Sequence, residues 1–180
     1  WRREGLTIRE LAITAGWNLL DDNILACSMS HIDKVFAMLK KSSKKYKQPI
    51  LLTGGLEAKR VNQDIAAKLD ELRPKRMYFA YDTPDDYEPL VNAGKLLKEA
   101  GFTTAHCSCY VLCGFPGDTP EDAIKRFVAT YKAGFIPMAM VYRDNADRRD
   151  NRSDVWRKIP HTWSRPAAVK AELKKMRIES

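Results

Sequence analysis

The sequence predicts an α/β fold of about five strand–helix units whose strands form one parallel sheet. Short apolar, β-prone runs alternate with segments of helical period from about residue 13 to residue 142. Strands expected to begin near residues 50, 77, 104 and 136 are 27 to 32 residues apart, so one unit recurs at nearly constant length. The periodicity of the sequence does not distinguish a doubly wound sheet from a full or partial barrel.

Five strands are expected, at residues 13–20, 50–53, 76–81, 104–114 and 136–142. Each is a short run rich in apolar, β-branched or aromatic residues, which is typical of a buried strand. The connections are long enough to hold the helix that a parallel crossover needs.

Helices are expected in these connections, because apolar residues recur there at intervals of three and four. Ser30, Thr83 and Thr119 are candidate N-terminal caps. Gly101 and Gly134 stand where a left-handed residue ends a helix. The apolar repeats are Ile32, Val35, Phe36 and Leu39, then Val61, Ile65, Leu69 and Leu72, then Ile124, Phe127, Val128 and Tyr131.

The segment after residue 142 differs in composition, so the chain divides into a βα unit of residues 1–142 and a basic extension of residues 143–180. The extension holds 11 basic and 6 acidic residues, and a helix is expected from about residue 166 to 178. It is either a solvated cover for the side of the sheet or a contact for nucleic acid or another anion. Trp156 and Trp163 are expected to be packing anchors rather than stacking platforms.

Composition excludes several classes of protein. With 44% hydrophobic and 30% charged residues, the chain is neither disordered nor membrane-spanning. The four cysteines and the lack of a secretory signal favour reduced thiols and a cytoplasmic location. The net charge of +8 favours anionic partners without specifying which.

Ligands of parallel α/β sheets bind at the carboxyl ends of the strands, so the residues that follow each strand are the candidate site. Asp21, Asp22 and Asn23 follow the first strand, and they would suit a cation or an ammonium group. The alternative is a turn in which such side chains hydrogen-bond their own backbone.

Paired glycines follow the second strand. Gly54 and Gly55 would allow a ligand to approach the backbone, and Lys59 or Arg60 could bind a carboxylate or phosphate. A plain tight turn is the alternative interpretation, and the glycine spacing excludes a P-loop.

The third and fourth strand ends differ in character. Asp82 could accept hydrogen bonds from ribose hydroxyls or cap the next helix. Gly114 opens a loop rich in glycine and proline that leads into a capped helix.

Three cysteines near His106 invite comparison with a metal site, but they fall within one predicted strand. At about 3.3 Å per residue, Cys109 and Cys113 are roughly 13 Å apart. That separation is too large for one ion or one cluster, so Cys107, Cys109 and Cys113 are expected to be buried core thiols rather than metal ligands.

The strand ends taken together resemble the radical S-adenosylmethionine (SAM) superfamily, over roughly residues 17–142. Residues 77–83 are similar to its strand that ends in an acidic residue and Ser or Thr, and Asp21-Asp22-Asn23 is similar to an ending found in some branches. The loop after the fourth strand resembles its Gly-x-Pro-Gly-x-Thr-x-Glu-Asp motif, here Gly114-Phe115-Pro116-Gly117-Asp118-Thr119-Pro120-Glu121-Asp122.

This resemblance implies a partial parallel βα barrel and two cofactors, SAM and a [4Fe-4S] cluster that reduces SAM to a radical. It also implies an electron donor such as flavodoxin or ferredoxin, and a substrate that stays unknown. Its implied SAM contacts are Asp21, Asp22 or Asn23 for the ammonium, Gly54 and Gly55 beside the cofactor, Lys59 or Arg60 for the carboxylate, Asp82 for the ribose, and Gly114 with Met138 and Met140 for the adenine.

The chain departs from the family in one respect: the cluster motif Cys-x3-Cys-x2-Cys is missing. The chain also starts at Trp1 without Met, so we expect the first strand and the cluster loop to precede it. Two rival functions stay open. One is a cluster-less binding or scaffold protein whose basic tail contacts nucleic acid, and the other is an unrelated βα enzyme whose Lys59 and Arg60 bind phosphate.

Overall fold

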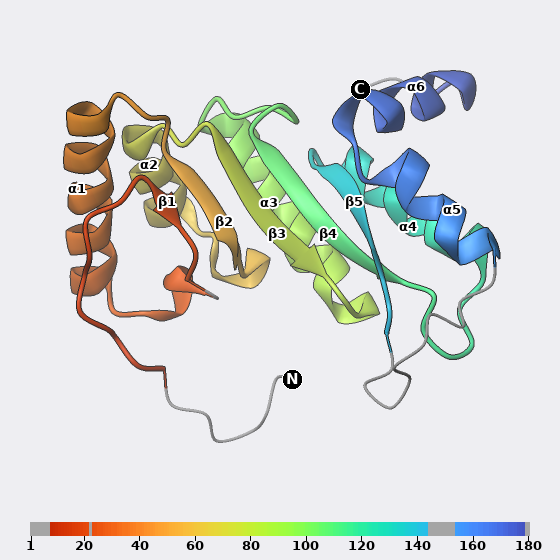
Figure 1. The fold of residues 1–180 in the computed structure, drawn as a ribbon, viewed down its shortest axis with the longest axis horizontal. Coiled ribbons are helices and arrows are strands. Elements are labelled where there is room, and N and C mark those ends of the chain that lie inside the picture. Colours follow the sequence, from red (N-terminus) through yellow and green to blue (C-terminus); the bar gives the residue numbers. More distant parts are fainter. Residues whose placement is uncertain (1–7, 22, 144–153, 179–180) are drawn as a thin grey trace.

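A computed structural model describes residues 8–21, 23–143 and 154–178 of the chain. Its centre is a parallel sheet with the strand order β1-β2-β3-β4-β5 (Figure 1). Each strand therefore pairs with its neighbour in the chain, and the predicted parallel α/β fold is confirmed. The strands are β1 (Asn18–Leu19), β2 (Leu51–Leu56), β3 (Arg76–Tyr81), β4 (Cys107–Cys113) and β5 (Ile136–Val141).

Pairing is regular in the middle of the sheet and irregular near β1. The β3–β4 register runs without a break from Met77↔Cys107 to Tyr81↔Val111. In β2 the register shifts between Leu52 and Leu56, and Gly55 there has a φ of 103°. The first strand is shorter than predicted, because the β1–β2 pairing in the described structure covers Asn18 and Leu19 and residues 13–16 have no sheet partner there.

Six α-helices lie in the described segments: α1 (Met29–Tyr46), α2 (Gln63–Leu72), α3 (Tyr87–Glu99), α4 (Pro120–Lys132), α5 (Asp154–Trp163) and α6 (Pro166–Lys175). Short 3-10 turns precede α1, α2 and α3, at Ile24–Ala26, Ala58–Arg60 and Pro84–Asp86.

Most of the predicted helix ends are confirmed. The Thr119 side chain accepts from the backbone N–H of Asp122, and Gly101 and Gly134 have φ angles of 83° and 97°. The expected cap at Ser30 is wrong: Ser28 caps α1, and its side chain accepts from the backbone N–H of His31 at 3.2 Å. Ser30 already lies in the first helical turn.

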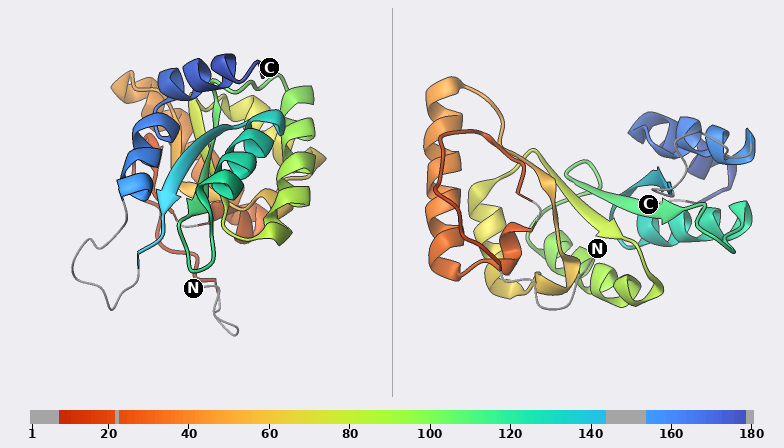
Figure 2. Two further views of the ribbon diagram at one scale, coloured as in Figure 1. Left: turned by 90° about the vertical axis from the view of Figure 1, so that its right-hand side faces the viewer. Right: turned by 60° about the horizontal axis from the view of Figure 1, so that its bottom comes forward.

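Helices α1 to α4 cover one face of the sheet (Figures 1 and 2). The burial of alternate residues agrees with this: Met77, Phe79 and Tyr81 of β3 are buried, while Tyr78 and Ala80 between them are only half-buried. The buried residues of the strands and of these helices form one hydrophobic core. The sheet thus has one helix-covered face and one face that these helices leave open.

The C-terminal segment covers the β5 side of the sheet, as one alternative expected, and it also contributes to the core. Helix α5, which was not predicted, and helix α6 bury apolar side chains in the same core, among them Ile159, Val169 and Leu173. Trp163 is buried and stacks on Phe127 of α4 at a centroid distance of 4.8 Å, so the predicted packing role of Trp163 is confirmed. Part of the basic segment, Arg148, Arg149 and Arg152, lies outside the described residues.

Within the described ranges, no helix combines the length and apolar character needed to cross a membrane.

The stack of Trp163 on Phe127 joins α5 to α4, so its removal should loosen the C-terminal segment. We expect Trp163→Ala to lower the free energy of unfolding by about 3 kcal/mol, measured by urea denaturation. Val155→Ala is the control, because Val155 is 49% exposed on the same helix. Equal effects of the two substitutions would contradict the assigned packing.

Candidate functional site

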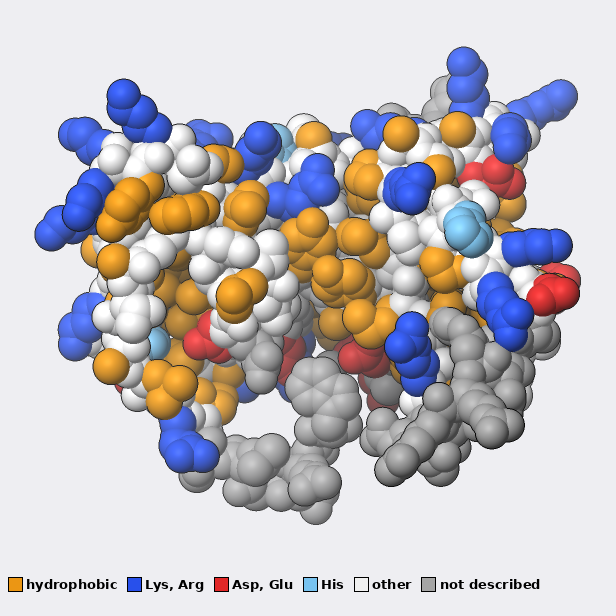
Figure 3. Space-filling view, viewed as in Figure 1, with side chains coloured by type: hydrophobic (Ala, Val, Ile, Leu, Met, Phe, Trp, Pro, Cys, Tyr) orange, Lys and Arg blue, Asp and Glu red, His pale blue; other side chains and the backbone are white. Residues whose placement is uncertain are grey.

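Beyond Arg76, at the start of β3, the open face of the sheet is uncharged over its middle strands. We define the open face by Tyr78 and Ala80 of β3, Tyr110 and Leu112 of β4, and Met138 and Met140 of β5. The strand registers pair Ala80 with Tyr110, Tyr110 with Met138 and Leu112 with Met140, which places these residues on one side. Figure 3 shows hydrophobic side chains gathered across the middle of this view.

Two tyrosines give the open face a flat aromatic surface. The rings of Tyr78 and Tyr110 stack at a centroid distance of 5.4 Å and an interplanar angle of 20°. Burial raises the pKa of Tyr110, and the neighbouring Tyr78 adds to the effect. The Tyr110 hydroxyl is therefore neutral near pH 7. Met140 is 45% exposed, so its thioether is accessible from the same side.

A polar cluster at the carboxyl ends of β1 and β2 is centred on Glu57, whose side chain is 16% exposed. The carboxylate accepts from Asn23 Nδ2 at 2.9 Å and from Arg60 Nε at 2.6 Å, and it contacts Lys59 Nζ at 2.7 Å. Burial alone would raise the pKa of Glu57, but these hydrogen bonds outweigh it and lower the pKa to about 2. Glu57 is therefore ionised and links the two strand ends.

This Glu57 cluster changes the interpretation of Lys59 and Arg60. The sequence predicted them as ligands for a carboxylate or phosphate. In the structure, each of the two side chains forms an ion pair with the Glu57 carboxylate. An external anion would have to share or displace Glu57. Sequence reasoning overlooked Glu57, although its position three residues before Arg60 and next to a strand end was an available signal.

The residues after β1 take different roles. Asp21 is exposed, and its Oδ1 accepts from the backbone N–H of Asn23 at 3.1 Å, so the alternative of a side-chain turn is confirmed for Asp21. Asp22 lies outside the described residues. Asn23 donates to Glu57, whereas its Oδ1 is buried and has no hydrogen-bond partner among the described residues. A buried acceptor without a partner is costly unless a donor binds to it.

Gly54 has a structural reason to be glycine. A Cβ at this position would lie 1.9 Å from the backbone oxygen of Asp21. The chain leaving β1 therefore passes directly over β2, and a side chain at Gly54 would separate the two. Gly55 follows with its positive φ and completes the irregular end of β2.

Asp82 is half-buried at the carboxyl end of β3, as predicted. It is not the cap of the next helix, because the residue in that position is Thr83. The Asp86 carboxylate accepts from the backbone N–H groups of Asp82 and Thr83 at 3.0 and 2.9 Å. Asp86 thus fixes the backbone at the point where the Asp82 side chain leaves the strand.

The loop after β4 is held by a buried ion pair that sequence reasoning missed. The Asp118 side chain is 2% exposed, and its carboxylate accepts from Arg126 Nη2 at 2.6 Å and from the backbone N–H of Gly114 at 2.7 Å. Arg126 also donates to the backbone oxygen of Leu112, and its guanidinium lies over the Phe115 ring. Gly114 has a φ of 73°, and Trp156 of α5 packs against it.

The cysteines of β4 are core residues, as predicted. Cys107, Cys109 and Cys113 are at most 2% exposed, on the helix-covered face. Burial raises the pKa of Cys107 to about 12 and that of Cys113 to about 11. No group of three or more His, Cys, Asp or Glu residues within the described segments is arranged to hold a metal ion.

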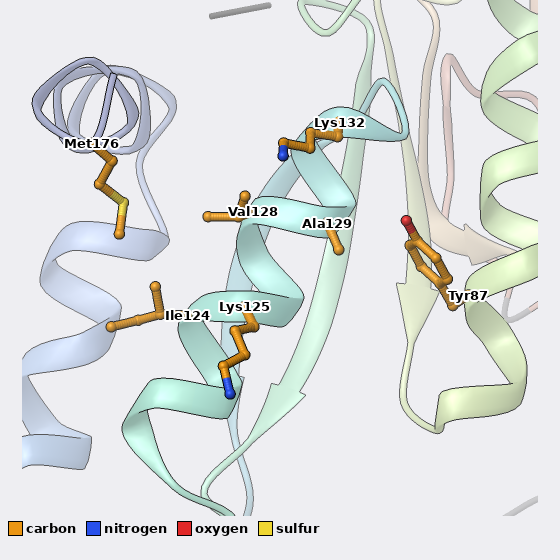
Figure 4. A pocket seen from close by; sticks show the side chains of 7 residues that line it. All are labelled: Tyr87, Ile124, Lys125, Val128, Ala129, Lys132 and Met176. Atoms are coloured by element: carbon orange, nitrogen blue, oxygen red, sulfur yellow. The ribbon is translucent and has the colours of Figure 1, made fainter. Parts of the chain in front are cut away.

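A cavity of about 410 Å³ lies among α3, α4 and α6, on the helix-covered side of the sheet (Figure 4). Ile124, Val128 and Met176 give it an apolar lining, and Lys125 and Lys132 are its charged residues. Lys125 is bound to Asp122 at 2.8 Å. The cavity holds no candidate site residue from the sequence analysis and is distinct from the carboxyl ends of the strands.

No protein-family model, curated protein or solved structure matches this chain.

The Asp118–Arg126 pair should be a strong stabilising feature of the β4 loop. We expect Asp118→Asn to lower the free energy of unfolding by roughly 3 kcal/mol, because it leaves the Arg126 charge buried without its counter-ion. Glu172→Gln is the control: it removes an exposed pair with Lys175 and should cost less than about 1 kcal/mol. Similar losses, measured by chemical denaturation, would contradict the burial argument.

The lowered pKa of Glu57 makes its contribution to stability depend on pH. The ionised form is favoured in the folded protein, so the contribution is complete above the ordinary value of 4.5 and is lost as pH falls toward about 2. We expect Glu57→Gln to lower the free energy of unfolding by about 1–2 kcal/mol at neutral pH. This value allows for solvent screening, because Lys59 and Arg60 are partly exposed. The cost should shrink at pH 3, measured by denaturation at both pH values. A pH-independent cost would contradict the assignment.

Proposed function

We propose that this chain is the C-terminal portion of a radical SAM enzyme, a partial parallel βα barrel that binds SAM at the carboxyl ends of its strands. One observation carries the proposal. Consecutive parallel strands with α1 to α4 on one face leave an open face that is uncharged beyond Arg76, and polar groups lie at its carboxyl edge in the order that the resemblance expects.

The buried Asn23 Oδ1 supports a site for the methionine ammonium group. It is an acceptor without a partner among the described residues, and an ammonium group is a donor with three hydrogens. Asp21, exposed beside it, adds negative charge that favours a cation. Asp21 and Asn23, at the end of β1, therefore fit the amino group of SAM.

The other end of the cofactor would meet β3, β4 and β5. In this proposal Asp82 accepts hydrogen bonds from the ribose hydroxyls. Gly114 with Met138 and Met140 provides an apolar surface for the adenine. The half-buried Met138 and the exposed Met140 suit this role, because a thioether packs favourably against an aromatic ring.

The carboxylate of SAM would be bound by Lys59 or Arg60. Both side chains are about half-exposed, and both retain hydrogen-bond donors beyond those directed at Glu57. In this arrangement Glu57 holds the two cations at the strand end, and the ligand carboxylate shares them.

The described residues do not fit a [4Fe-4S] cluster. Cys107, Cys109 and Cys113 are buried with raised pKa values on the helix-covered face, whereas cluster ligands are thiolates. The proposal for this chain is therefore confined to binding SAM, and the cluster ligands belong to residues outside it. The electron donor, flavodoxin or ferredoxin, and the unknown substrate belong to the same proposal for the whole enzyme.

Among the rival functions, a phosphate-using βα enzyme is less well supported, because Glu57 offsets one of the two positive charges that would hold a doubly charged phosphate. The cluster-less alternative with a nucleic-acid-binding tail has to use the exposed side chains of α5 and α6, since their apolar side chains belong to the core.

Calorimetry with SAM tests the site directly. We expect the 180-residue chain to bind SAM, and Asp82→Ala to weaken binding by about tenfold, the value of one hydrogen bond to a charged group. Asp85→Ala is the matched control, because Asp85 is exposed on the following turn and should leave the affinity unchanged. Failure to bind SAM, or equal affinities for the Asp82 and Asp85 variants, would contradict the proposal.

A further inference from the structure

The amino ends of the strands, at the opposite edge of the sheet, carry a concentrated positive charge. Residues 34–48 include six lysines and no acidic residue. Helix α1 ends among them, and Lys44 and Lys45 in its last turn also offset the helix dipole. Figure 3 shows Lys and Arg side chains gathered at the upper left, over this end of α1.

Other elements extend this charge across the sheet edge. The backbone N–H of Lys75 donates to the oxygen of Ile50, and the N–H of Leu51 donates to the oxygen of Trp17. The starts of β1, β2 and β3 are thus adjacent. We define the amino-end patch as Lys44, Lys45, Lys47 and Lys75 together with Trp17 and Tyr46.

The lysines of the amino-end patch are not neutralised by the fold. Of the six lysines in residues 34–48, Lys40 is the one with an ion pair among the described residues, to Glu71 at 3.7 Å. Lys44, Lys45, Lys47 and Lys75 have no such partner in the described parts of the chain. Lys44, Lys45 and Lys47 lie within four residues of the chain, and like charges close together repel each other unless an anion binds between them.

An aromatic pair lies within the patch. The rings of Trp17 and Tyr46 are 5.3 Å apart at an angle of 52°, and Tyr46 is 44% exposed. Lys45 Nζ lies 5.2 Å from the centre of the Tyr46 ring. A partly exposed ring flanked by cations is the arrangement on which a nucleobase stacks while its phosphates meet the lysines.

We infer that the amino-end patch binds single-stranded nucleic acid. The lysines supply contacts for consecutive phosphates, and Tyr46 with Trp17 supplies a surface for an unpaired base. An acidic protein would use the lysines without needing the ring. The patch is at the edge opposite to Asp82 and the Glu57 cluster, so the inference is independent of SAM binding.

Fluorescence anisotropy with a labelled oligonucleotide of about 20 unpaired nucleotides tests the inference on the 180-residue chain. We expect Lys45→Gln/Lys47→Gln to weaken binding by about tenfold in low salt and to reduce the salt slope by about 1.4, two phosphate contacts at 0.7 each. Lys170→Gln/Lys174→Gln is the matched control, because it removes equal charge from exposed positions of α6. An equal loss in both variants would overturn the inference.

A second variant tests the base contact. Tyr46→Leu keeps an apolar contact for Trp17 and removes the ring, and we expect it to weaken oligonucleotide binding about fivefold while leaving heparin binding unchanged. Tighter binding of heparin, a polyglutamate peptide or phosphatidylserine vesicles than of the oligonucleotide would overturn the inference in favour of another anion. Unchanged SAM calorimetry and thermal unfolding of each variant show that the fold and the carboxyl-end site are intact.

Discussion

The shared direction of the five strands is the constraint on which the rest of the structure depends. After each strand the chain must cross back from the carboxyl edge to the amino edge of the sheet before the next strand begins. Helices α1 to α4 make these crossovers on one face of the sheet. One face therefore becomes core, and these helices leave the other open. All carboxyl ends lie at one edge and all amino ends at the other, so residues far apart in sequence meet at each edge.

The same topology separates the charges. The helices begin at the carboxyl edge, where acidic residues such as Asp86 and Asp122 stabilise their first turns, and they end at the amino edge, where Lys44 and Lys132 stabilise their last turns. Helix dipoles favour acidic residues at one edge and basic residues at the other. Lys47 and Lys75 add basic charge outside any helix, so the dipole does not account for the whole amino-end patch.

The sequence predicted what depends on local pattern. Strand β3 has the bounds expected from its apolar run, and Thr119 caps α4 through its own side chain. Helix α5 escaped prediction because Pro160 lies within it and its two buried residues are too few to define a period. The Glu57 cluster and the Asp118–Arg126 pair also escaped, since each depends on a register or helix phase that fixes which distant side chains meet.

The distribution of polarity around the open face determines how a ligand can bind there. Beyond Arg76 the middle strands offer aromatic and apolar side chains without charge, so a charged group placed over them would lose its hydration without compensation. The carboxyl edge offers the ionised Glu57, the buried acceptor of Asn23 and the cations of Lys59 and Arg60. If a ligand with a charged end and an apolar or aromatic body binds here, this distribution favours one orientation, with its charges at the strand ends and its body across β4 and β5.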